Sequence, residues 1–366
     1  MSSVTLKDVY KRYRKVEAVR GVSIDVGPGE FVALLGPSGC GKSSTMRMIA
    51  GLEEVTAGDI LFDGKSVLDQ WPRDRNVAMA FETYALYPTL TVYENLAFPL
   101  RAAGLSSAET DKRVREMAEI VDIQELLDRK PGRLSSGQSQ LVGLARALIR
   151  KPSVFLLDEP ISHLDTRQRA IMRAYIKRLH IDLGYTMVYV THDQEEAMAL
   201  ADRVAVMDEG VFRQVGTPKE IFDEPVDNFV AGFIGDPPMN FLQGMCVKEG
   251  ERYSLTSDSI RLELPARVGE LGREGRLPEQ LTLGIRPFYL SVAFERKDGY
   301  NLPAQVFVVE PLGDMGIVSV DLDQTRFQVV VAPGFHAQPK QTVWLALDQD
   351  HMLLFDTKTG RALARR

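Results

Sequence analysis

The segment 36–43 has the residue types and spacing of a loop that holds a chain of phosphates. It fits the pattern G-x-x-x-x-G-K-[ST], and its residues are Gly36, Pro37, Ser38, Gly39, Cys40, Gly41, Lys42 and Ser43. Glycines allow successive backbone N–H groups to point at a phosphate, and a helix that begins after the loop adds its positive end. Lys42 can place a positive charge near the outer phosphates, and Ser43 can offer a hydroxyl oxygen to Mg²⁺. A chance turn would share the pattern, but the strand expected before it and the helix expected after it favour phosphate binding.

Two adjacent acidic residues, Asp158 and Glu159, follow the apolar run 154–157. Asp158, at the end of the expected strand, could hold Mg²⁺ directly or through a water molecule. Glu159 faces another way, because successive side chains of a strand alternate, and it could accept a proton from an attacking water. Alone, the pair could be only the polar end of a strand. The phosphate loop upstream favours a catalytic interpretation.

The elements that must position these residues alternate between strands and helices over the first two-thirds of the chain. Short apolar runs, several with β-branched residues, predict strands at Phe31–Leu35, 77–81, 154–157, 186–190 and 204–207. Helical patterns lie between them at 43–50, 109–121, 136–148 and 166–183. Short buried strands separated by helices predict an α/β domain with a largely parallel central sheet.

The pattern changes after about residue 228, where helical periodicity fades. Short β-rich pieces separated by Pro and Gly follow at 261–264, 281–285, 304–309, 317–322, 327–331, 343–347 and 352–355. They predict a small β-barrel or sandwich. The turn-rich segment 235–238 marks the expected boundary, so we predict an α/β domain over 1–235 and an all-β domain over 236–366.

Composition narrows the classes of protein to which the chain can belong. It has 366 residues, a formal net charge of −6 and 45% hydrophobic residues, which fit a globular protein of two domains and disfavour a general nucleic-acid binder. Its two cysteines, Cys40 and Cys246, form no disulfide framework and suggest a reducing compartment. No apolar run reaches the roughly 18 residues that cross a bilayer, and the N-terminus lacks the apolar core of a signal peptide. We therefore expect a cytosolic chain, unless another protein holds it at a membrane.

Further motifs carry a resemblance to a known family. Leu134-Ser135-Ser136-Gly137-Gln138 stands where that family has its Leu-Ser-Gly-Gly-Gln signature, Ser162-His163-Leu164-Asp165 resembles the loop after its catalytic Glu, and Thr191-His192-Asp193 resembles its switch histidine. The chain resembles the ATP-binding subunit of ATP-binding-cassette (ABC) transporters, and more narrowly the subunits of bacterial carbohydrate importers of the maltose and glycerol-phosphate type. Residues 229–241, 284–287 and 309–313 resemble the C-terminal regulatory domain of those subunits, an oligonucleotide/oligosaccharide-binding-type barrel. Arg286 in this part could equally be a solvated surface residue.

The resemblance implies a P-loop ATPase domain with a mixed central sheet, followed by a small all-β domain that is regulatory or serves dimerisation. It implies that Glu159, His192 and Glu82 are catalytic and that Tyr13 stacks on adenine. Besides the loop 36–43, the implied ATP-binding residues are Tyr13, Ser44, Ser135, Gly137, Gln138 and Asp165, and the implied Mg²⁺ ligands are Ser43, Glu82 and Asp158. Simpler interpretations stay open: Tyr13 as an ordinary strand aromatic, His192 as a structural histidine, and Ser135 as a helix N-cap, a role that does not exclude anion binding.

The family mechanism implies several partners. Two ATPase subunits hold two ATP molecules between them, each ATP lying between the phosphate loop of one subunit and the signature helix of the other. Two transmembrane permease subunits convert closure and opening of this dimer into transport. An extracytoplasmic solute-binding protein takes part indirectly, no nucleic acid is involved, and the chain lies peripherally at the cytoplasmic face of the membrane. The aromatic-rich segment 83–98 is either local core or the docking surface for a short cytoplasmic helix of the permease.

Two departures from the family pattern qualify these expectations. Glu82 stands where the family usually has Gln, and it adds negative charge beside Asp158, Glu159 and the triphosphate. We expect it to slow hydrolysis or to shift its pH dependence. Ser136 replaces the first Gly of the signature, whereas Gly137 is kept.

Three functions compete on the sequence. The first is the motor of an importer for a carbohydrate or a related polar solute. In a variant of this function, the chain is the regulatory or weakly hydrolysing partner of a second ATPase subunit. The second is a soluble ATPase of DNA repair or translation, which would need a coiled-coil insertion or a nucleic-acid-contacting arm that we do not find. The third is a mainly regulatory nucleotide-binding subunit. We expect the importer motor, since Lys42, Asp158, Glu159 and His192 are all present.

Overall fold

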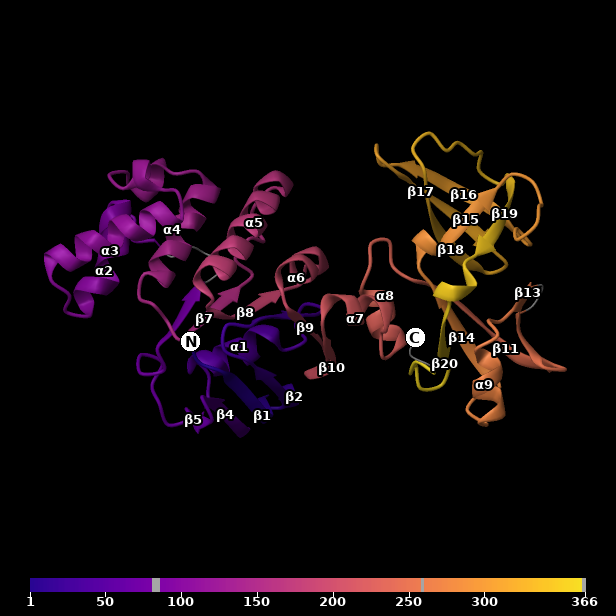
Figure 1. Cartoon of the computed structure of the whole chain (residues 1–366), viewed down its shortest axis with the longest axis horizontal. Helices are drawn as coiled ribbons and strands as arrows, with labels where there is room; N and C mark the ends of the chain where they lie inside the picture. The colour runs from indigo at the N-terminus through magenta and orange to yellow at the C-terminus, as the bar shows by residue number, and fades with distance from the viewer. Residues whose placement is uncertain (81–85, 258–259, 364–366) are drawn as a thin grey trace. The chain divides into compact units, whose positions relative to one another are not determined.

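The computed structural model describes residues 1–80, 86–257 and 260–363. The chain divides into two compact units, Met1–Pro218 and Lys219–Arg366, coloured from indigo to yellow along the chain in Figure 1. Each unit has a hydrophobic core of its own. The predicted boundary at 235–236 stays a prediction.

A six-stranded sheet forms the centre of the first unit, with strand order β10-β9-β3-β8-β7-β6. All neighbouring strands in it are parallel except β9 and β10. Its strands are β3 (Phe31–Leu35), β6 (Val77–Ala80), β7 (Val154–Asp158), β8 (Thr186–Thr191), β9 (Arg203–Asp208) and β10 (Val211–Gly216). Every residue of β3, β7 and β8 is buried, which explains why the sequence shows them as continuous apolar runs.

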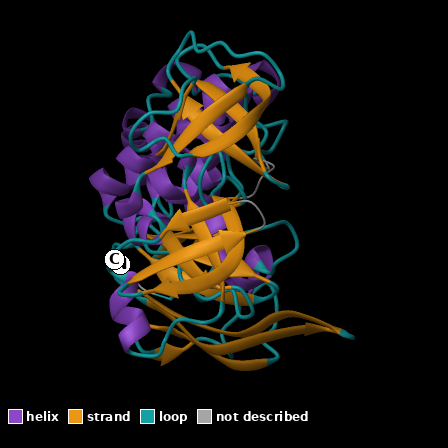
Figure 2. Ribbon diagram, turned by 90° about the vertical axis from the view of Figure 1, so that its right-hand side faces the viewer, coloured by secondary structure: helices purple, strands orange, loops and turns teal. Residues whose placement is uncertain are grey.

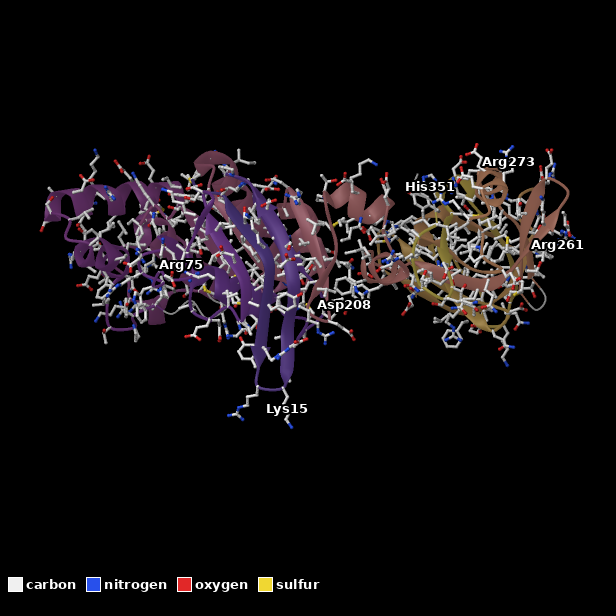
Figure 3. All side chains as sticks on the ribbon, turned by 90° about the horizontal axis from the view of Figure 1, so that it is seen from below. Lys15, Arg75, Asp208, Arg261, Arg273 and His351 are labelled. Atoms are coloured by element: carbon white, nitrogen blue, oxygen red, sulfur yellow. The ribbon has the colours of Figure 1, made fainter. Side chains whose placement is uncertain are left out.

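A second, antiparallel sheet packs against the first through a shared core. Its strand order is β2-β1-β4-β5, and the strands are β1 (Val4–Tyr13), β2 (Val16–Val26), β4 (Ala57–Phe62) and β5 (Lys65–Ser66). Helix α1 (Lys42–Ala50) contributes Met46 and Ile49 to this core, together with side chains from both sheets. Figure 3 shows Lys15 at the turn between β1 and β2, pointing away from the sheet. The helix that follows the phosphate loop is therefore fixed within a core rather than on a surface.

The remaining helices of the first unit fall into two groups. Helices α2, α3 and α4 gather together in Figure 1, and α5 packs on α6. They are α2 (Val92–Ala102), α3 (Ser107–Ile120), α4 (Ser136–Leu148), α5 (Thr166–Leu183) and α6 (Gln194–Leu200). None of the helices in the described part of the chain combines the length and apolar content that crossing a bilayer requires.

The second unit consists mainly of strands, with short helices, as Figures 1 and 2 show. Two five-stranded antiparallel sheets, β13-β12-β11-β14-β20 and β15-β19-β16-β17-β18, enclose its core. The strands are β11 (Asn240–Glu249), β12 (Arg252–Ser257), β13 (Ile260–Glu263), β14 (Gln280–Ile285), β15 (Leu290–Ala293), β16 (Leu302–Pro311), β17 (Gly316–Leu322), β18 (Thr325–Val331), β19 (Thr342–Leu347) and β20 (Leu353–Asp356). The helices are α7 (Pro218–Asp223), α8 (Asn228–Phe233) and α9 (Val268–Arg273). The prediction of an all-β C-terminal part is confirmed.

Arg286 is buried in the second unit, so its interpretation as a solvated surface residue is wrong. Its side chain donates to Ile234 O and Phe222 O, both at 2.5 Å, and lies 3.6 Å from the Phe222 ring centroid. Burial lowers its pKa to about 10. Since both carbonyls precede residue 236, the segment that carries α7 and α8 is tied to β14.

Candidate active site

Neighbouring parallel strands bring the predicted catalytic residues to one edge of the central sheet. Strands β3, β8 and β7 are adjacent and parallel, and they end at Leu35, Thr191 and Asp158. The phosphate loop follows β3, His192 follows β8, and Glu159 follows β7. The carboxyl ends of strands are where open α/β sheets bind their ligands. The sheet therefore gathers three motifs that are far apart in the sequence.

The phosphate loop requires glycine at two positions for reasons internal to this chain. A Cβ on Gly36 would lie 2.1 Å from Met207 O, which no side chain allows. Gly41 caps α1 with a left-handed backbone at φ 111°, and a Cβ there would lie 2.4 Å from Ala18 O. Lys42 is buried, and its Nζ donates to Gly36 O at 2.7 Å and to Pro37 O at 2.8 Å. The loop thus wraps around the Lys42 ammonium, as a site for the outer phosphates requires.

Ser43 and Asp158 offer oxygen atoms to a hard cation from opposite elements. Ser43 Oγ, at the start of α1, lies 3.2 Å from Asp158 Oδ1, at the end of β7. A hydroxyl and a carboxylate oxygen suit Mg²⁺, which usually takes few protein ligands and completes its shell with water and phosphate oxygens. No group of three or more His, Cys, Asp or Glu side chains is arranged as a metal site within 1–80, 86–257 and 260–363. This donor set fits a magnesium ion that arrives with a nucleotide.

Glu159 and His192 face one another across the ends of β7 and β8. Glu159 Oε2 lies 3.1 Å from His192 Nδ1, and Glu159 N donates to Val190 O at 3.0 Å. The Glu159 backbone has φ 46°, a left-handed conformation that is costly for a residue with a side chain and is found most often at functional sites. A carboxylate held against an imidazole in this way can accept a proton from water.

Tyr13 lies at the end of β1, partly exposed, beside the start of α1. Its hydroxyl is 3.4 Å from Ser44 Oγ, and Lys11 Nζ lies 4.8 Å from the centroid of its ring. Tyr13 is 39% exposed, so the face of its ring can receive another flat group. The structure brings Tyr13 and Ser44 together within one chain, next to the phosphate loop.

The signature segment forms the exposed N-terminus of α4. Ser135 is the N-cap: its Oγ accepts from Gln138 N at 3.2 Å, and Gln138 Oε1 accepts from Ser135 N at 3.0 Å. Ser135 is exposed, and apart from its chain neighbours and the backbone of its own helix, a Cβ on Gly137 would meet no atom of the described residues within 4 Å. Asp165 similarly caps α5 by accepting from Gln168 N at 2.9 Å. The simple interpretation of Ser135 as a helix cap is therefore confirmed, and it leaves the amino end of α4 open to an anion.

Glu82 lies outside the described residues, since β6 ends at Ala80 and the description resumes at residue 86. Sequence reasoning also missed Arg75, which is buried and donates from Nη1 to Met48 O and Ile49 O at the end of α1. Figure 3 labels this residue. The arginine is charged and lies in a turn-rich stretch, so nothing in the sequence distinguishes it from its exposed neighbour Arg73.

A cavity of about 500 Å³ lies beside β6, between α2 and α4. Tyr87 and Phe98 line it with rings 4.8 Å apart, each more than 40% exposed, and Arg146 lies 5.2 Å from the Tyr87 ring centroid. Burial lowers the pKa of Arg146. Gln140, a further lining residue, is 1% exposed, and its Oε1 has no hydrogen-bond partner among the described residues. We call this feature the aromatic groove; Tyr87 and Phe98, two residues of the predicted docking segment 83–98, belong to its lining.

Comparison with protein families identifies three parts of the chain. A family model described as ABC transporter matches residues 19–162, one described as MalK OB fold domain matches 235–287, and one described as TOBE domain matches 283–355. The chain is 46% identical to the trehalose/maltose import ATP-binding protein MalK of Thermococcus litoralis, over 99% of this chain and 100% of the relative. It is 43% identical to the sn-glycerol-3-phosphate import ATP-binding protein UgpC 1 of Rhizobium johnstonii, over 99% of this chain and 96% of the relative.

Solved structures similar to the chain cover between 59% and 60% of it. An ATP-binding cassette in a dimeric post-hydrolysis state, bound to ADP and Pi, is 30% identical with a TM-score of 0.53 and covers 59% of this chain and 98% of its own. The cbiO1 protein of Clostridium perfringens, part of the ABC transporter complex cbiONQ, is 29% identical with a TM-score of 0.57. The match covers 60% of this chain and 90% of that protein's chain.

Proposed function

The chain belongs to the ABC transporter family as an ATPase subunit, and from this premise we propose that it powers import of a carbohydrate or a related polar solute. The observation that carries the proposal is the meeting of the phosphate loop, Asp158, and the Glu159–His192 pair at the ends of three adjacent strands. Two relatives that match almost the whole chain are named for import of trehalose/maltose and of sn-glycerol-3-phosphate.

We propose the following roles for the residues of the site. The loop 36–43 binds the phosphates through its backbone N–H groups and Lys42, and the partly exposed Tyr13 ring stacks on adenine. Ser43 and Asp158 hold Mg²⁺, which when bound neutralises phosphate charge. Glu159 accepts the proton of the attacking water, and His192 Nδ1 holds the Glu159 carboxylate in place.

The second half of each nucleotide site comes, in our proposal, from a second ATPase subunit. Gly137 supports this, because neither crowding nor a left-handed backbone within this chain requires a glycine there. Its missing side chain leaves the α4 N-terminus free to approach an external anion, such as the γ-phosphate bound by the partner. Ser135, Gln138 and Asp165 lie in the same kind of exposed helix start. The geometry does not favour a weakly hydrolysing variant, since Lys42, Asp158, Glu159 and His192 are in place.

The aromatic groove is the docking site that we propose for a short helix of the permease. Its exposed aromatic rings suit an apolar helix face, and Arg146 and Arg150 in its lining suit an acidic side chain on that helix. Through this contact the chain would lie peripherally at the cytoplasmic face of the membrane, with a solute-binding protein acting on the outer side.

Reconstitution of the native complex tests the proposal. The chain is purified from the membrane fraction with its bound proteins, and the complex is placed in vesicles with ATP available to it. Uptake of maltose, trehalose and sn-glycerol-3-phosphate is measured with wild type and with Glu159→Gln. ATP-dependent uptake of a solute by the wild type alone supports the function. A chain that stays in the soluble fraction, or a complex that neither hydrolyses ATP nor transports, contradicts it.

A further inference from the structure

A buried glutamate lies beneath the loop that carries His192. Glu196, in α6, is 3% exposed, and its Oε2 accepts hydrogen bonds from Tyr189 Oη at 2.9 Å and from Thr191 Oγ1 at 2.7 Å. Tyr189 and Thr191 belong to β8 and are themselves buried. Burial raises the pKa of both Glu196 and Tyr189. A buried acidic group lowers the free energy of unfolding unless its hydrogen bonds are made. These two hydrogen bonds therefore stabilise the local structure around Glu196.

The hydrogen bonds continue from Glu196 to the backbone on the far side of His192. Thr191 Oγ1 donates to Glu196 and accepts from Asp193 N at 2.9 Å. Asp193 Oδ1 in turn accepts from Glu195 N at 2.8 Å and from Glu196 N at 3.3 Å. The residues immediately before and after His192 are thus both fixed by the start of α6. His192 itself is exposed and makes its contact with Glu159 from this fixed support.

A second tie joins the same loop to α5. Arg169 Nη1 lies 3.3 Å from Asp193 Oδ2, and α5 begins directly after Asp165. Arg169 Nε is buried and has no hydrogen-bond partner in the part of the chain that the structure describes. The support of His192 therefore includes the helix that starts in the loop after Glu159.

We propose that Glu196 is a positioning residue for ATP hydrolysis: through Tyr189 and Thr191 it holds the backbone of His192 so that the imidazole meets Glu159. The proposal rests on the roles given to His192 and Glu159 above. Because Glu196 is 3% exposed and its carboxylate is bonded to Tyr189 and Thr191, we expect it to act on the rate of the chemical step and not on ATP affinity. Small displacements of a catalytic group reduce rates strongly, because reactive geometry is confined to a few tenths of an ångström.

The chain offers a matched control for this residue. Glu195 precedes Glu196 in the same helix, but its side chain is 68% exposed and pairs with Arg173 of α5 at 2.9 Å. Glu195→Ala removes a carboxylate and a link between α6 and α5 without disturbing the Thr191 contact. Glu196→Gln keeps an oxygen that can accept from both hydroxyls. Tyr189→Phe removes one of the two hydrogen bonds by deleting a single oxygen atom and keeps the ring in the core.

The test measures ATP turnover by the complex of the chain with its permease, for each variant in a His192 and in a His192→Ala background. We expect Glu196→Ala to lower kcat by at least about tenfold with KM for ATP changed less than about threefold, and Tyr189→Phe to lower kcat severalfold. Glu196→Gln should retain most of the turnover, and Glu195→Ala should retain all of it. In the His192→Ala background, Glu196→Ala should cause little further loss, because both changes remove the same contribution.

The outcomes separate this proposal from the function on which it rests. If His192→Ala lowers turnover but both Glu196→Ala and Tyr189→Phe keep wild-type kcat, only the positioning role is overturned. Equal losses from Glu196→Ala in both backgrounds, or a loss from Glu195→Ala as large as from Glu196→Ala, also overturn it. If His192→Ala leaves turnover unchanged, the catalytic role proposed for His192 is contradicted, and the positioning role of Glu196 is contradicted with it. Should Glu196→Ala not fold, the Tyr189→Phe result in the two backgrounds decides.

Discussion

Single residues at the ends of β7 and β8 determine what the site can do. Glu159 is held in a left-handed backbone conformation with its carboxylate 3.1 Å from His192 Nδ1. Its position, its strain and its partner all agree with a group that accepts a proton from water. Sequence motifs predicted both residues and the phosphate loop, because phosphate binding requires fixed residue types at a fixed spacing. They did not predict Glu196, since a buried glutamate in a helix has the same letter as an exposed one.

Glu159→Gln tests the proposed base. The amide keeps the shape of the side chain but does not take up a proton, so we expect kcat to fall about 10²- to 10⁴-fold while ATP still binds. ATP turnover and nucleotide affinity of the assembled complex are measured side by side. Glu209 is a suitable control, because it is an exposed glutamate that also has a positive φ, of 43°. Loss of turnover in Glu209→Gln, or normal turnover in Glu159→Gln, would contradict the assignment.

Glu82 remains a prediction from sequence, because it lies outside the described residues. If it joins Asp158 and Glu159 near the triphosphate, like charges repel and raise one another's pKa. We then expect Glu82→Gln to hydrolyse ATP faster, or with a different pH dependence, than wild type. The measurement is the ATPase rate of the assembled transporter against pH. Identical curves of ATPase rate against pH for wild type and Glu82→Gln would contradict an effect of Glu82 on hydrolysis.

Helix α1 follows the phosphate loop, and it is held in place by residues that take no part in catalysis. Its start is set by Gly41, where a Cβ would clash with Ala18 O, and its last turn is held by Arg75, which donates to Met48 O and Ile49 O. The glycines could be predicted from the motif. Arg75 could not, because its partners are backbone carbonyls that become available only when the helix ends beside it. The antiparallel sheet β2-β1-β4-β5 and helix α2 were likewise not predicted, since their strands and helix mix polar and apolar residues.

Removing the Arg75 side chain should weaken the anchoring of α1. Arg75→Ala leaves two carbonyls at the helix end without their charged donor, and we expect the free energy of unfolding of the first unit to fall by about 2–4 kcal/mol. Thermal and denaturant unfolding of the full chain measure it. Arg73→Ala is the control, because Arg73 is 82% exposed and its contact with Asp74 is long, at 3.7 Å. Equal free energies of unfolding for Arg75→Ala and Arg73→Ala would contradict the structural role of Arg75.

The whole molecule combines an ATPase unit, a β-rich unit and a groove that the ATPase chemistry does not use. The order of an α/β part followed by an all-β part was predicted from the change in periodicity, and the family comparison confirms it. The aromatic groove was only partly predicted: aromatic residues at 83–98 suggested a docking surface, but α4 supplies Arg146 and Gln140. Those residues come from a distant part of the sequence, so only the fold brings them to the groove.

A charge placed in the groove should separate the chain from its permease. Phe98 is 46% exposed and lines the groove, so Phe98→Arg is tolerated by the fold but opposes an apolar helix in that place. We expect the amount of permease that copurifies with the chain to fall at least about tenfold, with ATP binding unchanged. Ile181→Arg is the control, because Ile181 is 69% exposed on α5 and does not line the groove. Undiminished copurification with Phe98→Arg would reject this docking site.

The central claim is that each nucleotide lies between the phosphate loop of one ATPase chain and the α4 N-terminus of another. Ser38 in the loop and Ser135 at α4 are both exposed, so each can carry a reactive thiol. Two differently tagged copies, one Ser38→Cys and the other Ser135→Cys, are mixed in a Glu159→Gln background, and disulfide formation between them is followed with and without Mg²⁺-ATP. We predict a cross-link between the two tags that appears when ATP is bound and is absent without it. If ATP binds but no cross-link joins the two copies, the composite site is contradicted.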